Sequence, residues 1–408
     1  MTQTDNIWPG KNLTEVPYAV YDDEQIYARE RERIFQGPTW NILGLECEVP
    51  EAGDYKTTFL GDIPIVVVRG QDGALRGFEN RCAHRGALLC LEKFGKTKVF
   101  TCVYHAWSYD HDGNLVGVAF QNGIQGQGGM PDDFCREDHG LHRVKIAVLA
   151  GLIFGSFDPD VQGLEDYLGP DHVRHIHRVL PKSPKVLGYY TQTLQNNWKL
   201  YAENVRDPYH ASILHLFFTT FRVNRLSQKG GILVSEGGGN HVSYSKLDPN
   251  GDDREYDKEK LRADSEFGLK ASALLGGIDE FNDGITIQIL SVFPNLVIQQ
   301  VFNSLVVRQI VPRGVDTADI LWTTYGFADD DDAMSEMRQL HSNYVGPAGY
   351  ISMEDGAVGN FIQRALPGTA GEASVVKMGG VDATSMESRA TETSVRGFWK
   401  AYRHHMGL

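Results

Sequence analysis

Residues 80–109 contain two short segments that each combine a cysteine with a histidine. The first is Cys82-x-His84 and the second is Cys102-x-x-His105, with 17 residues between them. Each segment can place one thiolate and one imidazole on a tight turn. Two such loops can hold a two-iron, two-sulfur cluster, with the cysteines on one iron and the histidines on the other. Because neutral imidazoles replace two thiolates, such a cluster has a raised reduction potential. The spacing therefore predicts an electron-transfer centre.

Zinc is the alternative metal, since it also binds two cysteines with two histidines. Zinc fingers, however, usually pair cysteine with cysteine and histidine with histidine, whereas each segment here is mixed. The flanking Arg85-Gly86 and Trp107 also match the pattern of Rieske-type iron–sulfur loops. We therefore favour iron over zinc and over a chance grouping of core residues. The remaining cysteines have no paired histidine, and we expect ordinary buried thiols at Cys47, Cys90 and Cys135.

A second group of candidate ligands lies in residues 203–215 (ENVRDPYHASILH). His210 and His215 are five residues apart, and Asp207 precedes His210 by three. On a helix kinked by Pro208, the two imidazoles could face one pocket. Two histidines and a distant carboxylate form the facial triad of non-haem Fe(II) oxygenases, which leaves positions open for O₂.

The third ligand of this triad is expected in residues 346–360 (GPAGYISMEDGAVGN). Either Glu354 or Asp355 could serve, and we favour Asp355. Taken alone, the histidine pair also fits ordinary buried or surface histidines. An electron-transfer cluster in the same chain needs an acceptor, however, and this favours the iron site.

The surrounding sequence predicts the elements that position these residues. From about Thr39 to Asp158, short β-type runs such as 63–69 and 152–157 alternate with turn signals at Asp72-Gly73 and Asp112-Gly113, which is typical of a small all-β domain. After Asp158 the pattern is mixed. Helices are expected in 17–36, 196–215, 334–343 and 391–406, strands in 285–312, and loops in 228–253.

Composition limits the classes of function. The chain has 408 residues, which favours two domains, and a net charge of −14, which disfavours nucleic-acid binding. No apolar run reaches the roughly 18 residues that a membrane helix needs, and residues 1–20 lack a signal-peptide pattern. We expect a cytoplasmic protein that neither spans a membrane nor binds nucleic acid.

Taken together, these residues resemble the α-subunits of ring-hydroxylating Rieske oxygenases, from about Trp8 to Gly407. Three segments are most similar to the terephthalate 1,2-dioxygenase branch of that family, and anthranilate dioxygenases and salicylate 5-hydroxylases are more distant. These segments are QNNWKLYAENVRDPYHASILH, GPAGYISMEDGAVG and RATETSVRGFWKAYR. The resemblance implies an α+β fold in which a Rieske β-domain, residues 38–158, is inserted in a helix-grip catalytic domain formed by 1–37 and 159–408.

The resemblance also implies roles for individual residues. Cys82, His84, Cys102 and His105 match the cluster ligands, and His210, His215 and Asp355 match the ligands of a mononuclear Fe(II). Asp207 matches the aspartate that connects a cluster histidine of a neighbouring subunit to an iron-ligand histidine, although a turn or helix cap is the other role for an Asp-Pro step. Asn204 matches a polar residue near the iron, and a structural role is equally open.

Two arginines are candidates for binding the carboxylate of a substrate. Arg308 lies in a strand-like apolar run, where a charge needs a buried partner, and a guanidinium suits bidentate carboxylate binding. Arg396, in the segment TSVRGFWK, resembles a second substrate-side arginine. An internal salt bridge for Arg308 and a solvated helix face for Arg396 are the alternatives.

The resemblance implies the oxygenase component of an aromatic-carboxylate dioxygenase, most similar to one that converts terephthalate to a cis-dihydrodiol. A separate reductase, with or without a ferredoxin, would deliver electrons from NAD(P)H. The expected assembly is a head-to-tail trimer of this chain, with or without small β-subunits. Monohydroxylation of the salicylate type is the close alternative, and a Rieske electron carrier or a zinc-binding module represents another class.

Overall fold

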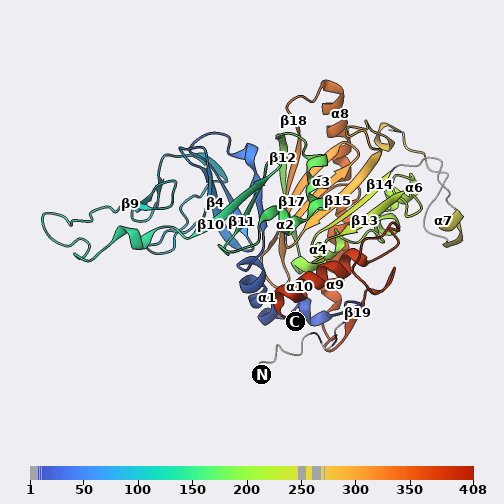
Figure 1. Ribbon diagram of the computed structural model, residues 1–408, viewed down its shortest axis with the longest axis horizontal. Coiled ribbons are helices and arrows are strands. Elements are labelled where there is room, and N and C mark those ends of the chain that lie inside the picture. The colour runs from blue at the N-terminus through green and yellow to red at the C-terminus, as the bar shows by residue number, and fades with distance from the viewer. Residues whose placement is uncertain (1–7, 9, 11, 247–253, 260–267, 271) are drawn as a thin grey trace. The chain divides into compact units, whose positions relative to one another are not determined.

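The computed structural model describes residues 8, 10, 12–246, 254–259, 268–270 and 272–408. The chain divides into two compact units (Figure 1). Phe35–Val161 form one unit, which we call the β-unit, and Met1–Ile34 with Gln162–Leu408 form the other, the α+β unit. The boundaries expected from the sequence, 38–158, differ from this division by three residues at each end.

The β-unit is built on antiparallel strands joined by tight turns. Its large sheet has the order β2 (Asn41–Leu45), β11 (Leu152–Ser156), β10 (Arg143–Leu149), β5 (Leu75–Glu79), β4 (Ile63–Arg69), β3 (Asp54–Leu60) and β6 (Phe94–Lys96). A small sheet has the order β7 (Phe100–Thr101), β8 (Ser108–Tyr109) and β9 (Leu115–Gly117), and the unit also contains the 3-10 turns η4 (Glu46–Glu48) and η5 (Arg136–His139). The predicted turns are confirmed, since Asp72-Gly73 joins β4 to β5 and Asp112-Gly113 joins β8 to β9.

The α+β unit is built on one antiparallel sheet of seven strands. Its order is β12 (Pro184–Leu194), β18 (Ala318–Phe327), β17 (Ser304–Pro312), β16 (Leu296–Val301), β15 (Ile285–Val292), β14 (His241–Lys246) and β13 (Gly230–Val234). A separate pair is formed by β1 (Glu15–Pro17) and β19 (Ala373–Val375). Antiparallel sheet with helices confirms the predicted α+β class.

Short helices precede and interrupt this sheet, and longer ones follow it. The α-helices are α1 (Glu24–Glu30), α2 (Leu164–Leu168), α3 (Pro170–Val179), α4 (Trp198–Asn204), α5 (Ala211–Leu214), α6 (Leu216–Thr220), α7 (Arg254–Glu259), α8 (Asp332–His341), α9 (Ser352–Ala365) and α10 (Thr393–Met406). Three short 3-10 helices are η2 (Tyr18–Tyr21), η6 (Ser272–Leu275) and η7 (Ser342–Tyr344), and η3 (Arg31–Phe35) is a short π-helix. Within the described residues, no helix combines the length and apolar composition that a membrane crossing would require.

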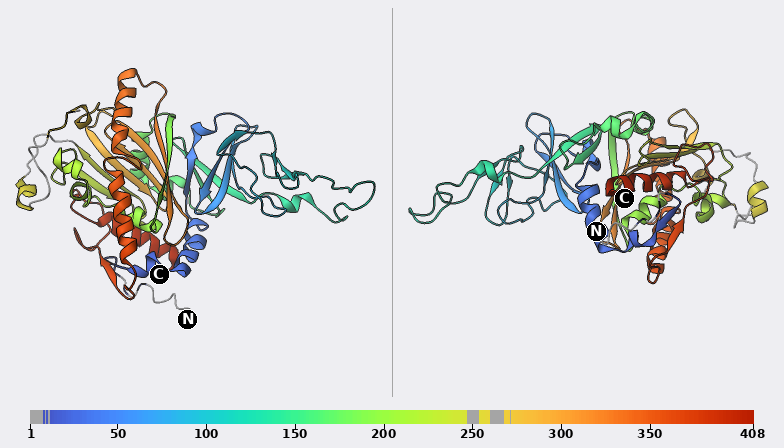
Figure 2. Two further views of the ribbon diagram at one scale, coloured as in Figure 1. Left: turned by 180° about the vertical axis from the view of Figure 1, so that it is seen from behind. Right: turned by 60° about the horizontal axis from the view of Figure 1, so that its bottom comes forward.

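The two faces of the sheet have different neighbours because side chains alternate along a strand. Gln288 and Gln300 project to the face covered by α3, where they bond to His175 and Arg178. Figure 1 shows α3 in front of the strands, and the view from behind in Figure 2 shows α8 and α9 on the other side. Residues of opposite parity on the same strands, among them Gln299, line the pocket described below.

A buried carboxylate fixes helix α4, which leads to the candidate iron ligands. Glu30 accepts hydrogen bonds from the indole of Trp198 (2.8 Å) and the hydroxyl of Tyr402 (2.6 Å), and it lies 2.6 Å from the ammonium of Lys199. Glu30 and Lys199 are fully buried. A buried ion pair with these additional bonds holds α1, α4 and α10 in one arrangement, because breaking it would leave a buried charge without a partner.

The helices expected from the sequence are found with different boundaries. The predicted helix 17–36 is instead η2, α1 and η3, because Asp23 caps a new helix by accepting from the N–H groups of Gln25 (2.7 Å) and Ile26 (3.0 Å). The predicted helix 196–215 is α4 and α5, with Pro208 in the break between them. The helices predicted at 334–343 and 391–406 are confirmed as α8 and α10.

The prediction of loops in 228–253 was wrong for its first part, since β13 and β14 lie there, and 247–253 lie outside the described residues. The glycines that suggested a loop serve close packing. A Cβ on Gly230 would lie 2.2 Å from the carbonyl oxygen of Tyr244 and 3.0 Å from Nε of Arg389. Glycine is therefore required in this edge strand by its neighbours.

Candidate metal centres and the adjoining pocket

The two Cys/His loops of the β-unit have the same backbone hydrogen bonds. The N–H of Cys82 donates to the carbonyl of Ala87 (2.8 Å), and the N–H of Gly86 donates to the carbonyl of Cys82 (2.9 Å). In the second loop the N–H of Cys102 donates to the carbonyl of Trp107 (2.8 Å), and the N–H of Ala106 to the carbonyl of Cys102 (2.9 Å). Two loops of equal shape can present their side chains to one cluster from opposite sides.

A left-handed residue occupies the same position in both loops. Gly86 has φ of 75° and Ala106 has φ of 54°. A residue with a Cβ is disfavoured in this region, and strain of this kind often marks functional loops. The conformation at Ala106 is therefore evidence that the second loop is shaped for a task as well as for packing.

Burial separates the cysteines from the histidines. Cys82 and Cys102 are 2% and 3% exposed and belong to the core of the β-unit, whereas His84 is partly and His105 largely exposed. The two imidazole rings lie with their centroids 4.6 Å apart. Buried thiolates and an outward pair of imidazoles fit a [2Fe–2S] cluster whose histidine-bound iron faces the surface.

Tyr109, which follows the second loop, contributes a further contact. Its hydroxyl lies 3.3 Å from Sγ of Cys82 and accepts from the N–H of Ala83 (3.0 Å). With its acceptor side used by Ala83, the hydroxyl proton is free to donate to the sulfur. Hydrogen bonds to cluster sulfurs tune the potential. The other three cysteines differ from one another: Cys90 is buried as expected, but Cys47 is half-buried and Cys135 is exposed.

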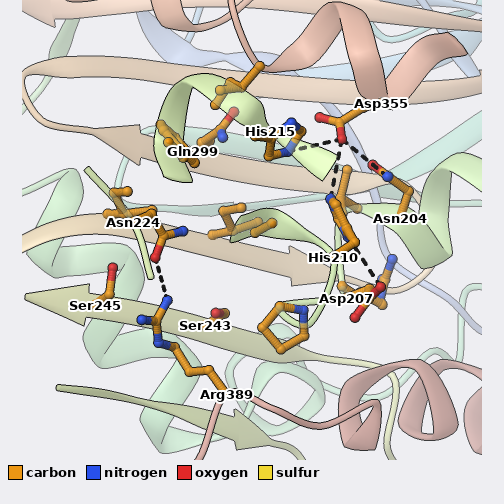
Figure 3. Close-up of a pocket in the computed structure, with 18 of the residues that line it drawn as sticks. Asn204, Asp207, His210, His215, Asn224, Ser243, Ser245, Gln299, Asp355 and Arg389 are labelled. Atoms are coloured by element: carbon orange, nitrogen blue, oxygen red, sulfur yellow. Dashed lines mark hydrogen bonds and ion pairs between the residues drawn. The ribbon is translucent and has the colours of Figure 1, made fainter. Parts of the chain in front are cut away.

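The second predicted ligand group is brought together in the α+β unit. The ligand atoms of His210, His215 and Asp355 lie within 4.8 Å of one another. Nε2 of each histidine lies 3.3 Å from the same oxygen, Oδ1 of Asp355 (Figure 3). This donor set of two imidazoles and one carboxylate on converging side chains fits a divalent iron with open positions.

Two further carboxylates fix the orientation of the imidazoles. Nδ1 of His210 lies 3.2 Å from Oδ2 of Asp207, and Nδ1 of His215 lies 2.8 Å from Oε2 of Glu354. Because a carboxylate accepts, each Nδ1 carries a proton, and Nε2 is the nitrogen that each ring could offer to a metal. Asn204 completes the group by donating from Nδ2 to Oδ1 of Asp355 (3.2 Å).

The charges of this group attract one another. Burial opposes charge on His210, but bonds to Asp207 and Asp355 raise the pKa of its imidazole to about 10. Burial likewise disfavours ionised Asp355, but the charge of His215 and the bond to His210 lower the pKa of the carboxyl group to about 2. A divalent cation would compete with protons for the same lone pairs.

The ligand group lines a pocket together with apolar and basic side chains. Its lining includes Arg308 from β17, which is 1% exposed. Arg308 donates from Nη1 to the hydroxyl of Tyr201 (2.7 Å) and from Nη2 to Oε1 of Gln299, and its Nε has no hydrogen-bond partner. No carboxylate of the described residues lies within ion-pair distance of it, so the internal salt bridge that was an alternative is not observed.

Two further buried arginines line the pocket, Arg206 and Arg389, and the sequence singled out neither. Arg206 donates to the backbone carbonyls of Ala202 (2.7 Å) and Gly239 (3.4 Å). Arg389, 3% exposed, donates from Nη1 to Oδ1 of Asn224 (2.6 Å) and from Nη2 to the carbonyl of Arg225, and its Nε is unpaired (Figure 3). Removal from water lowers the pKa of Arg389 to about 10. Its segment, RATETSVRGFWKAYR, carried part of the resemblance, but nothing in the spacing distinguishes Arg389 from Arg396.

Arg396, which the sequence suggested instead, is not among the residues that line this pocket. It is fully buried and donates to three backbone carbonyls, those of Asp382 (2.7 Å), Met378 (3.0 Å) and Val376 (3.2 Å). Its helix position is thus neither solvated nor directed to the pocket. Its guanidinium donates to backbone carbonyls of the segment before α10. Arg389 therefore replaces Arg396 as the second candidate for binding an anion.

The fold and the two sites define a non-haem iron oxidoreductase that carries its own iron–sulfur domain. Comparison with family models agrees: residues 39–126 match the Rieske [2Fe-2S] domain, and residues 168–408 match the catalytic domain of the ring-hydroxylating alpha subunit. The chain belongs to the family of ring-hydroxylating dioxygenase alpha subunits. Its cofactors are accordingly a Rieske cluster and a mononuclear iron, as the sequence predicted.

Several curated relatives match nearly the whole chain. The large subunit of terephthalate 1,2-dioxygenase from Comamonas sp. (terminal oxygenase component subunit alpha 2) is 55% identical, over 98% of this chain and 97% of its own. The anthranilate 1,2-dioxygenase large subunit of Burkholderia cepacia is 43% identical (98% and 95%), and the salicylate 5-hydroxylase large oxygenase component of Ralstonia sp. is 36% identical (98% and 96%). The predicted resemblance is confirmed.

A solved structure with the same architecture is naphthalene 1,2-dioxygenase from Rhodococcus sp. bound to indole. It superposes with a TM-score of 0.79 at 25% identity and covers 96% of this chain and 94% of its own. Each of the two units therefore has a counterpart in this structure.

Proposed function

We propose that this chain is the terminal oxygenase component of an aromatic-carboxylate dioxygenase, with terephthalate as its substrate and a cis-dihydrodiol as its product. The observation that carries this proposal is the set of buried arginines in the pocket of His210, His215 and Asp355, of which we assign Arg308 and Arg389 to carboxylate binding. Terephthalate, anthranilate and salicylate, for which three relatives are named, are all aromatic carboxylates.

Burying a guanidinium without a carboxylate partner is costly, and such a charge is normally compensated. Arg308 and Arg389 are each held by neutral acceptors, and each keeps an unpaired Nε. A carboxylate that accepts two parallel N–H groups would compensate the charge and fix the ligand in the plane of the guanidinium. A substrate carboxylate is therefore the negatively charged acceptor that these two guanidinium groups lack.

The remaining lining suits the ring of such a substrate. Ile287 and Ile289 from β15 and Phe218 from α6 provide apolar surface in the same pocket. Apolar walls with a few fixed polar groups are typical of small-molecule sites. An anchored carboxylate would therefore direct an edge of the ring toward the ligand group.

We assign Cys82, His84, Cys102 and His105 as cluster ligands and His210, His215 and Asp355 as ligands of the mononuclear iron. The bound iron centres supply electron transfer and O₂ activation. The protein itself holds the imidazoles in one tautomer through Asp207 and Glu354, and Asn204 donates to the ligand carboxylate. In this assignment Asn204 orients Asp355.

The surface around the cluster loops supports assembly into a head-to-tail trimer. Apolar side chains stand exposed on and beside the loops, with Val103 74% and Leu91 65% exposed, and Tyr104 is also exposed. Exposed apolar groups of this kind mark interaction surfaces. We propose that the catalytic domain of a second copy covers them, so that Asp207 of one subunit connects to a cluster histidine of its neighbour.

A separate reductase would supply the electrons, as expected for a terminal oxygenase component. Monohydroxylation remains the alternative reaction, because a salicylate 5-hydroxylase component is also a relative. An electron carrier would have no use for the ligand group of the α+β unit or for the match to the catalytic domain over residues 168–408.

Product analysis with purified reductase and a panel of carboxylates tests the proposal. The panel comprises terephthalate, isophthalate, phthalate, anthranilate, salicylate and benzoate, with ¹⁸O₂ as oxidant. Terephthalate should give the highest kcat/KM and a cis-dihydrodiol that contains two labelled oxygens. A phenol with one labelled oxygen would favour the monohydroxylase. Toluene is added as a neutral control, and turnover of toluene but of none of the acids would refute the role of the arginines.

A further inference from the structure

Tyr256 of helix α7 makes hydrogen bonds to two segments that border the candidate iron site. Its hydroxyl lies 2.5 Å from Oγ of Ser212 and accepts from the N–H of Leu226 (2.7 Å). The side chain is 5% exposed. Although α7 is short, this one residue is thus anchored deep in the α+β unit.

Ser212 belongs to the segment that carries two of the candidate iron ligands. It lies between His210 and His215, and its backbone departs from helical geometry (φ −103°, ψ 17°). Its carbonyl accepts from Oγ1 of Thr219 (2.5 Å), and its hydroxyl meets Tyr256. These contacts hold the kinked backbone between the two histidines in place.

The same tyrosine is connected to the anion-binding end of the pocket. The guanidinium of Arg225 lies over the ring of Tyr256 (5.0 Å to the centroid) and donates to the carbonyl of Thr219 (2.7 Å). The carbonyl of Arg225 in turn accepts from Nη2 of Arg389. A continuous set of contacts therefore runs from Arg389 through Arg225 and Tyr256 to Ser212.

We propose that Tyr256 is a positioning residue that fixes the His210–His215 segment through Ser212 and couples it to Arg389. The coupling, which rests on the proposed function of Arg389, lets the binding of a substrate carboxylate adjust the ligand geometry. Physical coupling of this kind needs contacts that both sites share, and Arg225 with Tyr256 provides them.

The experiment uses the full chain with an intact, oxidised Rieske cluster and an emptied mononuclear site, titrated with Co(II) and followed by EPR. Tyr256→Phe removes only the hydroxyl and keeps the ring beneath Arg225. Tyr325→Phe is the matched control, because it removes another buried hydroxyl, which donates to the carbonyl of Val179 (3.0 Å). Loss of a group that orients metal ligands typically weakens metal binding by about 10- to 100-fold.

We expect Tyr256→Phe to weaken Co(II) binding about 10-fold and Tyr325→Phe to leave it within about twofold of the wild type. Ser212→Ala should also weaken it, and the double variant should bind no more weakly than Tyr256→Phe alone, since the contact that Ser212→Ala removes is already absent from Tyr256→Phe. Equal affinities for Tyr256→Phe and the control, or losses that add in the double variant, would overturn the positioning role.

A second arm adds terephthalate to the Co(II) protein. The line shape should change in the wild type and stay unchanged in Tyr256→Phe. If terephthalate binds and changes the two proteins alike, or changes neither, the coupling is refuted. If terephthalate and the other five acids all fail to bind the wild type, both the proposed function and the coupling are refuted. The positioning role of Tyr256 is tested separately, by the Co(II) affinities alone.

Discussion

Glu354 and Asp355 are adjacent in sequence and contact opposite nitrogens of His215. Oε2 of Glu354 lies 2.8 Å from Nδ1, and Oδ1 of Asp355 lies 3.3 Å from Nε2. Successive residues of a helix point about 100° apart, so α9 can place the two carboxylates around one imidazole. Asp355 is thereby free to bind the metal while Glu354 orients the ring.

Replacing Glu354 tests this division of roles. Glu354→Ala should weaken binding of Fe(II) at the mononuclear site by about 10- to 100-fold, because His215 loses the acceptor that fixes its tautomer. Glu354→Gln, which still accepts from Nδ1, should bind more tightly than the alanine variant. The measurement is iron content after dialysis against defined Fe(II). Iron retention by the alanine variant equal to that of the wild type would contradict the role.

Arg389 and Arg396, the two buried arginines of the C-terminal segment, are expected to have different roles, one in substrate binding and one in stability. Arg389→Gln should raise the KM for terephthalate by about 10- to 100-fold, because a hydrogen bond to a charged group contributes about 1.5–3 kcal/mol. Arg396→Gln should leave KM unchanged and lower the melting temperature, since three backbone carbonyls lose their donor. Steady-state kinetics and thermal unfolding of both variants are the measurements, and the reverse pattern would return the substrate role to Arg396.

The hydroxyl of Tyr109 should raise the reduction potential of the cluster. A donor to a sulfur stabilises the reduced, more negative cluster, so Tyr109→Phe should lower the potential. A bond that favours the reduced state by about 1 kcal/mol corresponds to roughly 40 mV for one electron. EPR-monitored redox titration measures the shift. Tyr55→Phe, a substitution elsewhere in the β-unit, is the control, and equal potentials in both variants would exclude the role.

Burial of Glu203 predicts a dependence of stability on pH. Removal from water raises the pKa of this carboxyl group to about 7, although the Tyr21 hydroxyl donates to it and acts in the opposite direction. Because the folded chain retains a proton that the unfolded chain releases above about pH 4.5, stability falls as the pH rises from about 4.5 to 7. The loss is roughly 3 kcal/mol.

Glu203→Gln cannot ionise and should escape this loss. Its melting temperature relative to the wild type should therefore increase between pH 5 and pH 8, while Glu336→Gln, at an exposed position on α8, should show no such trend. Thermal unfolding by circular dichroism at several pH values provides the comparison. A constant difference between Glu203→Gln and the wild type across this range would show that Glu203 is ionised throughout.

The metal-ligand candidates could be predicted because most of the information is local. Cys82 and His84, or His210 and His215, lie within a few residues of each other, so their spacing already indicates a shared loop or turn. The choice of Asp355 over Glu354 needed the resemblance, since neighbouring carboxylates are equivalent in sequence until a helix fixes their directions.

The basic lining of the pocket could be predicted only in part: Arg308 was expected from its apolar strand, but Arg389 was not. Arg389 reaches it because Gly230, far away in sequence, leaves space beside Nε, and Asn224 and Arg225 supply acceptors. Arg396 lies seven residues further on the same segment and is equally buried. Only tertiary packing separates a guanidinium that faces a pocket from one that satisfies backbone carbonyls.

A single-turnover measurement tests most directly whether the electron held by the Cys82/His84/Cys102/His105 cluster is used at the site of His210, His215 and Asp355. The fully reduced oxygenase, free of reductase, is mixed with O₂ and terephthalate, and cluster oxidation and product are followed together. Dihydroxylation consumes O₂, two protons and two electrons; the cluster would provide one electron and the mononuclear Fe(II) the other. We predict that dihydrodiol forms at the rate of cluster oxidation, and that Asp207→Ala, with both centres loaded, shows neither. Product formation while the cluster stays reduced, or normal turnover in Asp207→Ala, would contradict this electron path.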